Sequence, residues 1–246
     1  MPVTRLLFAT AMASTVIATV VTTVIATVIF RSDAEPALTT PLMGFSAPFV
    51  FGRFNVPKGN PLTVEAVALG RRLFYDVRLS ANNSISCATC HMQHLAFTDG
   101  KPTAIGISGK KLAFNSMSLA NLLWGSEHFF WNGRADSLEQ QALIPIQDID
   151  EMGQNLDELV VELNADAHYK AMFAAAYGDI NADNIAKALS AFERTLVSSH
   201  SKYDQYLRGE ATLTDQETLE ESSLSLIPTS KLACVVAIVS IATANS

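Results

Sequence analysis

The chain has 246 residues, with 17 lysines and arginines against 24 aspartates and glutamates, so its net charge is −7. A chain of this length has room for one sizeable core with tails, and this one lacks the basic balance that nucleic-acid binding requires. The composition therefore argues against a nucleic-acid partner and fits a basic protein partner or a neutral small molecule.

The N-terminal segment is strongly apolar. Residues Leu6 to Phe30 carry no charge and are flanked by Arg5 and Arg31. Such a run predicts a secretory signal peptide or a single membrane anchor, and either one places the rest of the chain in the periplasm or an equivalent compartment. Its length of about 25 residues favours an anchor, whereas the small residues of Ser32-Asp33-Ala34 offer a cleavage site. We expect residues 1–34 to be one or the other.

Prolines punctuate the next stretch, residues 35–60, which we expect to form an extended arm. A domain over residues 61–216 follows, and its first helix is expected to begin after Thr63 as N-cap. Apolar spacing predicts further helices over residues 137–144, 155–163, 168–177 and 184–198. No stretch of this domain alternates like a β-strand, so the predicted fold class is all-α with long loops.

Two of the three cysteines lie in the run Cys87-Ala-Thr-Cys90-His91. A redox disulfide would need a βαβ setting, and a structural zinc would need a second ligand pair, for which only His91 and His94 are at hand. The full run Cys-x-x-Cys-His is the signature of c-type haem attachment, because two thiols on one helical turn add to the two vinyl groups and the histidine ligates the iron. The sequence therefore predicts one covalent haem c, held by Cys87 and Cys90, with His91 as the metal ligand. His94 is expected on the surface or beside a haem propionate.

Residues 69–91, LGRRLFYDVRLSANNSISCATCH, resemble the haem-bearing N-terminal part of bacterial di-haem cytochrome c peroxidases and their MauG-type relatives. Three more stretches follow in that family's order: HLAFTDG, FFWNGRADSLEQQALIPIQDIDEMG and ALSAFERTLVSSHSKYDQYLRG. The resemblance covers roughly residues 60–216. It implies a c-type cytochrome domain whose haem reduces hydrogen peroxide with electrons from a small donor protein, a cytochrome c or a copper protein.

The resemblance also implies roles for particular residues. Peroxide reduction needs a group that moves a proton between the two oxygens, and the resemblance assigns this role to Glu151 in DIDEMG. Gln141 in LEQQAL would orient the distal pocket, and Pro145 is expected to end the helix between them. Trp131 matches a tryptophan that passes electrons between two haems, with a plain core aromatic as the alternative. Arg134 would pair with a haem propionate or cap local structure.

One departure from the family concerns the second face of the iron. Many members carry a histidine sixteen residues beyond the proximal one, and in this sequence that position holds Ile107. We therefore expect an open, high-spin iron, as in MauG-type relatives.

A second departure lies at the C-terminal end of the resemblance. The family continues into a second haem domain, but residues 217–246 hold Cys234 without a following cysteine and histidine. We expect this stretch to be an aberrant tail and the chain to be a truncated di-haem enzyme. Cys234 would then be free to join two copies into a homodimer.

Three functions remain open at this point. The first is an exported haem peroxidase, and the second is a MauG-type relative that oxidises another substrate, which Ile107 slightly favours. The third is a mono-haem electron carrier or an inactive fragment without enzymatic turnover. A carrier needs a second strong axial ligand, for which Met92, Met117 and Met152 are candidates that no motif places over the iron.

Overall fold

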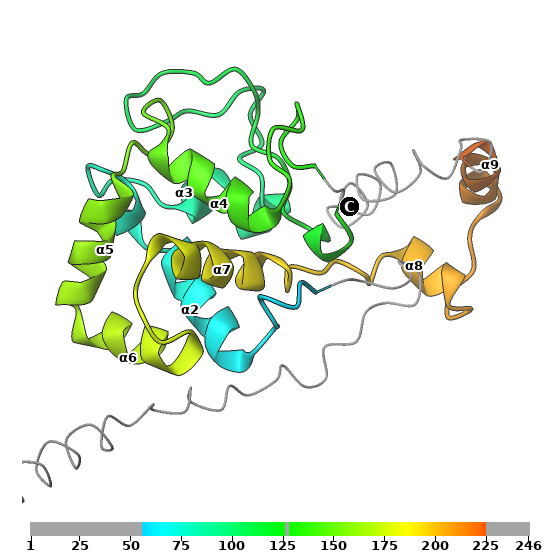
Figure 1. Ribbon diagram of the computed structural model, residues 1–246. Helices are drawn as coiled ribbons and strands as arrows, with labels where there is room; N and C mark the ends of the chain where they lie inside the picture. The colour runs from blue at the N-terminus through cyan, green and yellow to red at the C-terminus, as the bar shows by residue number, and fades with distance from the viewer. Residues whose placement is uncertain (1–55, 126–127, 225–246) are drawn as a thin grey trace, which may run out of the picture. The chain divides into compact units, whose positions relative to one another are not determined.

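The computed structural model describes residues 56–125 and 128–224, and within them the fold is helical, with isolated bridges and no β-strand (Figure 1). The longer helices are α2 (Val64–Phe74), α4 (Leu138–Gln147), α5 (Leu156–Ala165), α6 (Ala167–Ala176), α7 (Ala182–Glu193) and α9 (Asp215–Leu224). Shorter ones are α3 (Cys87–Cys90), α8 (Lys202–Leu207), η2 (Val77–Leu79), η3 (Gln93–Leu95) and η4 (Leu122–Trp124). The predicted all-α class is confirmed for this part of the chain.

Several sequence predictions fall outside the described residues. These are the apolar segment over residues 1–34, most of the arm over residues 35–60, and the tail from residue 225 with Cys234. In the two described stretches, no helix is long and apolar enough to cross a membrane.

Polar side chains start the helices where the sequence predicts. The hydroxyl of Thr63 accepts a hydrogen bond from the backbone N–H of Ala66 (3.2 Å), which caps α2. Ser137 caps α4 and Asn155 caps α5 in the same way. These caps satisfy N–H groups that have no partner inside the helix, and each is worth about 1 kcal/mol.

Helix α7 forms the centre of the core, and it packs against both α2 and α4 (Figure 1). Its face with Ile185, Leu189 and Phe192 is buried in the main hydrophobic cluster. The contact with α2 is close at Gly70, where a Cβ would overlap the carbonyl oxygen of Ala188. A glycine is therefore required at this crossing if the two helices are to keep their separation.

Helix α7 is shorter than predicted, because it ends at Glu193 and not at Ser198. The residues beyond it are held by Asn121, whose backbone N–H donates to the carbonyl oxygen of Leu196 (2.8 Å). The Asn121 side chain both donates to the carbonyl oxygen of Ser198 (3.1 Å) and accepts from its N–H (2.9 Å). This pairing keeps the segment out of the helix, and apolar spacing alone does not reveal it.

The expectation that Pro145 ends its helix is wrong, because α4 continues to Gln147. Proline removes only its own N–H donor, which would have served the carbonyl of Gln141. Beyond the proline, the N–H of Asp148 bonds to the carbonyl oxygen of Ile144 (3.0 Å), so the last turn still closes. The chain then turns back, and the N–H of Met152 donates to the carbonyl oxygen of Pro145 (3.2 Å).

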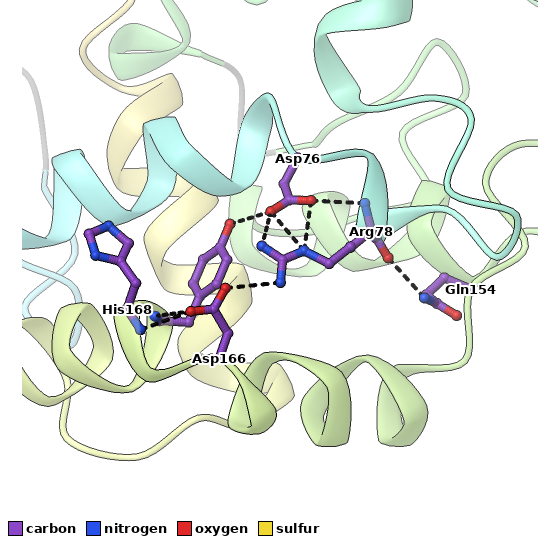
Figure 2. A network of polar contacts seen from close by, with 6 residues as sticks. Asp76, Arg78, Gln154, Asp166 and His168 are labelled. Carbon is purple, nitrogen blue, oxygen red and sulfur yellow. Dashed lines mark hydrogen bonds and ion pairs between the residues drawn. The ribbon is translucent and has the colours of Figure 1, made fainter.

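A polar network ties the end of α2 to the returning loop (Figure 2). The guanidinium of Arg78 pairs with Asp76 (2.7 Å) and with Asp166 (3.1 Å), and the hydroxyl of Tyr169 donates to Asp76 (2.7 Å). The backbone carbonyl of Arg78 accepts a hydrogen bond from the side chain of Gln154 (2.8 Å). The loop over residues 148–154 is thereby fixed to α2 and to the junction of α5 and α6.

Candidate functional site

The two cysteines of the motif lie on the single helical turn α3. The N–H of His91 donates to the carbonyl oxygen of Cys87 (2.9 Å), which closes the turn. Thr89 stabilises its start, because the Thr89 hydroxyl accepts from the N–H of Ser86 (3.0 Å). Residues three apart on a helix lie on one face, so the turn brings the thiols of Cys87 and Cys90 to the same side.

The imidazole of His91 is held in one tautomer. Its Nδ1 lies 2.8 Å from the carbonyl oxygen of Phe97. A carbonyl can only accept, so Nδ1 carries the proton and Nε2 keeps its lone pair. Burial lowers the pKa of His91, against hydrogen bonds to the main chain of Phe97 and Met117. The lowered pKa leaves the imidazole neutral, and the proton on Nδ1 leaves the lone pair of Nε2 available to a metal.

The carbonyl that holds His91 comes from a strained stretch of backbone. Ala96 and Phe97 both have left-handed conformations, with φ of 54° and 59°. Such conformations are uncommon outside glycine and cost about 1–3 kcal/mol each, and they persist where the surroundings enforce them. The backbone strain therefore lies beside the proposed metal ligand.

Both thiols are in surroundings that disfavour the thiolate. Burial raises the pKa of Cys87, and the neighbouring charge of Glu193 raises it further. Burial also raises the pKa of Cys90, with added contributions from Asp99 and Glu151. Zinc ligation and thiol redox chemistry both need a thiolate. Nor do residues 56–125 and 128–224 contain any group of three His, Cys, Asp or Glu residues placed to hold a metal ion.

A cavity of about 510 Å³ opens beside α3. Its wall includes all seven residues that the sequence singled out, namely Cys87, Cys90, His91, Trp131, Arg134, Gln141 and Glu151. They come from α3, α4 and the loops before and after α4. Residues separated by up to 64 positions (151 − 87) in the sequence thus surround one space.

Two buried polar atoms on this wall lack a partner among the described residues: Gln141 Oε1 and Glu193 Oε2. Buried polar atoms are rarely left unpaired, so they point to a group that fills the cavity and offers hydrogen bonds. Two enclosed thiols and the Nε2 of His91 fit a covalently attached haem, and the two unpaired oxygens would be satisfied by a donor such as water beside it. Glu193 was missed by the sequence analysis, although its spacing of four from Leu189 puts a carboxyl on the apolar face of α7.

The loop that carries Glu151 is fixed from two sides. The N–H of Ile107 donates to the carbonyl oxygen of Glu151 (2.9 Å), and the N–H of Ala81 donates to that of Met152 (2.9 Å). Gly106 packs so closely that a Cβ there would overlap the carbonyl oxygen of Asp150. Glu151 is therefore presented to the cavity by a backbone with little freedom.

The surroundings of Glu151 raise the pKa of its carboxyl. Burial raises the pKa of its carboxyl, the nearby charge of Asp148 raises it further, and Arg134 opposes both. A carboxyl whose pKa moves toward neutrality can both accept and donate a proton under working conditions.

The structure corrects one alternative for Trp131 and describes the surroundings of Arg134. The indole of Trp131 is 56% exposed at the cavity rim, so its interpretation as a plain core aromatic is wrong. Its neighbour Phe130 is instead covered by the guanidinium of Arg134, 3.5 Å above the ring centre. Arg134 also donates to the side chain of Asn132 (3.1 Å), so it does support local structure.

Ile107 does not belong to the cavity wall. Its side chain packs behind the Glu151 loop, where a Cβ at Gly153 would lie 3.0 Å from Ile107 Cδ1. Of the wall residues in the described part of the chain, His91 is the one histidine, and Met117 and Met152 are the methionines. An open iron remains a prediction.

A helical fold with a Cys-x-x-Cys-His turn at the wall of a cavity is characteristic of the c-type cytochromes. The model of one family, described as "Di-haem cytochrome c peroxidase", matches residues 64–212. The chain belongs to this family, as the sequence motifs predicted.

Individual relatives agree with this assignment. The chain is 45% identical over 157 residues to the methylamine utilization protein MauG of Methylorubrum extorquens, covering 63% of this chain and 44% of that one. It is 36% identical over 165 residues to the cytochrome c peroxidase Ccp of Escherichia coli, covering 66% and 35%. A crystal structure of a MauG-like protein associated with microbial copper homeostasis aligns with a TM-score of 0.68 and 40% identity, over 74% of this chain and 55% of that one. The chain thus spans about half of these relatives or less.

Proposed function

We propose that this chain is an exported c-type haem domain that reduces hydrogen peroxide with electrons from a small redox protein. The observation that carries the proposal is the shared cavity, whose wall combines the Cys-x-x-Cys-His turn with Glu151 and Gln141. The haem peroxidase character of the family supports the reaction class. The periplasmic location rests on the apolar segment at residues 1–34 and on the compartment in which c-type haem is attached.

Particular residues would hold the haem. Cys87 and Cys90 would form the two thioether bonds, and His91 would bind the iron through Nε2. Gln141 Oε1 and Glu193 Oε2, which lack a partner in the described chain, would gain hydrogen bonds from water or peroxide bound beside the haem. A haem held in this way would supply the redox-active iron at which the peroxide O–O bond is broken.

Glu151 would handle the protons of the reaction. Reduction of one hydrogen peroxide to two waters consumes two electrons and two protons. As a carboxylate, Glu151 takes the proton from one peroxide oxygen, and as a carboxylic acid it delivers that proton to the departing oxygen. Its raised pKa makes the carboxylate a stronger proton acceptor than an exposed one. Gln141, which lies on α4 in the same cavity wall, would orient the peroxide by hydrogen bonding.

A MauG-type oxidation of another substrate is the second candidate, and the exposed indole of Trp131 favours it. An aromatic ring at the cavity rim can pass an electron from a substrate that stays outside, and this one is 56% exposed. A third candidate is a mono-haem carrier with Met152 as second ligand, because Met152 directly follows Glu151 on the wall.

One experiment separates the two peroxide-reactive functions from the electron carrier. The chain, expressed with a haem-attachment system, is denatured and its covalent haem is counted, alongside a variant with Cys87→Ser and Cys90→Ser. We expect one haem per chain, none in the variant, and a high-spin ferric spectrum that responds to hydrogen peroxide. Haem that survives denaturation in the variant would refute the attachment site, and a low-spin, peroxide-inert spectrum would favour the carrier. Glu151→Gln should keep the haem and lower the rate with peroxide by about 10²–10⁴-fold.

A further inference from the structure

A shallow hollow lies between α2 and α6 and shares no lining residue with the haem cavity. Its wall includes Arg71, Arg72 and Tyr75 from α2 and its C-cap, and His168 from α6. The imidazole of His168 projects from α6 toward α2 in Figure 2. Tyr75 is 46% exposed there, and neighbouring Val77 is 41% exposed.

The hollow carries positive charge that no carboxylate of the described residues neutralises. Within residues 56–125 and 128–224, no carboxylate forms an ion pair with Arg71 or Arg72. The acidic residue on the wall, Asp76, is already bound by Arg78 (2.7 Å) and by the hydroxyl of Tyr169 (2.7 Å). The guanidinium of Arg72 stacks over the ring of Tyr169 (5.2 Å), which leaves its charge without a carboxylate. Exposed apolar side chains beside arginines that have no carboxylate partner are typical of surfaces that bind an oppositely charged protein.

A column of aromatic rings leads inward from this hollow. The ring of Tyr75 lies edge-on to that of Phe74, with centroids 5.3 Å apart, and Phe74 is fully buried. The ring of Phe97 follows, 6.3 Å from that of Phe74. The carbonyl oxygen of Phe97 then accepts the hydrogen bond from His91 Nδ1 (2.8 Å). Packed rings and one hydrogen bond thus connect the surface with the proposed iron ligand.

Phe97 links the aromatic column to His91 through its backbone conformation. Its left-handed conformation (φ 59°) accompanies a carbonyl that meets His91 and a ring that meets Phe74. Electrons cross a protein more readily through packed atoms and hydrogen bonds than through gaps. The column therefore offers an efficient path to a buried iron.

We infer that this hollow is the docking site of an acidic electron-donor protein, and that Tyr75, Phe74 and Phe97 form the route from the donor to His91. The inference rests on the proposed haem at His91. In the transfer, the donor is oxidised by one electron and the iron is reduced by one, and no covalent bond forms or breaks. Arg71 and Arg72 attract the acidic face of the donor, and Tyr75 receives its redox centre.

The test uses the haem-loaded chain and a reduced acidic cupredoxin as probe, because reduced copper is colourless and the haem absorbance is then read alone. Stopped-flow absorbance gives the rate of haem reduction against cupredoxin concentration and salt. Arg71→Glu is compared with Lys58→Glu, a matched charge reversal at an exposed residue outside the hollow. Tyr75→Leu tests the route, and dithionite provides a small reductant that needs no docking site.

We expect Arg71→Glu to lower the second-order rate constant about tenfold or more at low salt, and Lys58→Glu to change it less than twofold. The difference should disappear near 1 M salt, where screening is strong. Tyr75→Leu should lower the limiting rate at saturating cupredoxin by a larger factor than it changes the half-saturating concentration. Dithionite should reduce all variants equally.

Equal effects of Arg71→Glu and Lys58→Glu would overturn the docking site, and an unchanged limiting rate in Tyr75→Leu would overturn the route. Inhibition by inorganic phosphate beyond that of chloride at equal ionic strength would assign the hollow to a small anion instead. A chain without covalent haem would refute the proposed function, and this inference with it, whereas a haem that only dithionite reduces would refute this inference alone.

Discussion

Arg194 and Glu139 form a two-pronged ion pair that joins the end of α7 to the first turn of α4. The two guanidinium nitrogens of Arg194 lie 2.7 and 2.9 Å from the two carboxylate oxygens of Glu139. The Arg194 side chain is only 7% exposed. Asn60 extends the pair, because its side chain donates to Glu139 (2.7 Å) and accepts from the hydroxyl of Tyr177 (2.9 Å).

Removing one partner of this pair should destabilise the fold strongly. Arg194→Leu leaves the Glu139 carboxylate buried without its counter-charge, so we expect a loss of about 3–5 kcal/mol in the free energy of unfolding. The control is Lys187→Ala, which breaks the more exposed pair with Asp183 and should cost about 0.3–0.5 kcal/mol. Urea unfolding at pH 7 measures both. Equal losses in the two variants would contradict a structural role for the buried pair.

The same pair predicts a loss of stability in acid. The pKa of Glu139 is lowered in the folded chain, where hydrogen bonds and charge from Arg194 outweigh the effect of burial. A carboxyl whose pKa is lowered by folding stabilises the fold at pH values above its pKa in the unfolded chain, near 4.5. This contribution is lost as the pH falls through its pKa in the folded chain. Glu139→Gln should therefore flatten the stability of the chain between pH 5 and pH 3, as followed by urea unfolding. An acid loss as steep as that of the unaltered chain would assign it to other carboxylates.

Charges around Glu151 should move the pH dependence of the peroxide reaction in opposite directions. If the carboxylate form starts the reaction, the rate rises as the pH passes the pKa of Glu151. Asp148→Asn removes a like charge and should shift that rise to lower pH, whereas Arg134→Leu removes an opposing charge and should shift it to higher pH. Stopped-flow rates between pH 4 and pH 8 measure the shift. Shifts of the same sign in both variants would exclude Glu151 as the titrating group.

The close contact at Gly106 should control where Glu151 lies. In Gly106→Ala the new methyl group would displace the carbonyl of Asp150, and with it the loop that presents Glu151. A displacement of about 1 Å can cost on the order of 10²-fold in rate, so we expect slower peroxide reduction with unchanged haem content. Gly59→Ala is the control, because its Cβ would meet nothing within 4 Å. An unaltered rate in Gly106→Ala would show that this contact does not position the loop.

The sequence predicted most of the local structure for identifiable reasons. Caps such as Thr63 and Ser137 indicate helix starts, because each side chain bonds to an N–H only three residues further along. The Cys-x-x-Cys-His turn could likewise be predicted, since its functional residues lie within five consecutive positions. Helix ends were less predictable, because Asn121 holds Ser198, 77 residues further along the chain, outside α7. Such long-range pairings leave no trace in apolar spacing.

The candidate site could be predicted where motifs carried it and not where packing created it. Gln141 and Glu151 were found through family motifs, and their presence on one wall depends on the folded loops. Glu193 carried only a weak signal, a charged residue at an apolar position of α7. The column through Phe74 and Phe97 depends on two left-handed residues whose conformation no local pattern predicts.

Glu193 should make the fold less stable as the pH rises. Burial raises its pKa to about 8, with Arg194 opposing the shift and Glu139 adding to it. Its other close neighbour is the Cys87 thiol, and the α2 residues packed in the same cluster, such as Leu69 and Leu73, are apolar. Between about pH 4.5 and pH 8 the folded chain therefore keeps the proton of Glu193, whereas the unfolded chain, in which the pKa is near 4.5, has lost it.

The contribution of Glu193 is therefore most favourable below about pH 4.5 and declines until about pH 8. Glu193→Gln keeps the shape and removes the charge, so this variant should lose less stability between pH 5 and pH 8, by on the order of 1–3 kcal/mol. Urea unfolding of the haem-loaded chain at the two pH values measures the difference, with the exposed Glu162→Gln as control. Parallel pH profiles for the unaltered chain and Glu193→Gln would show that the pKa of Glu193 is not raised in the folded chain.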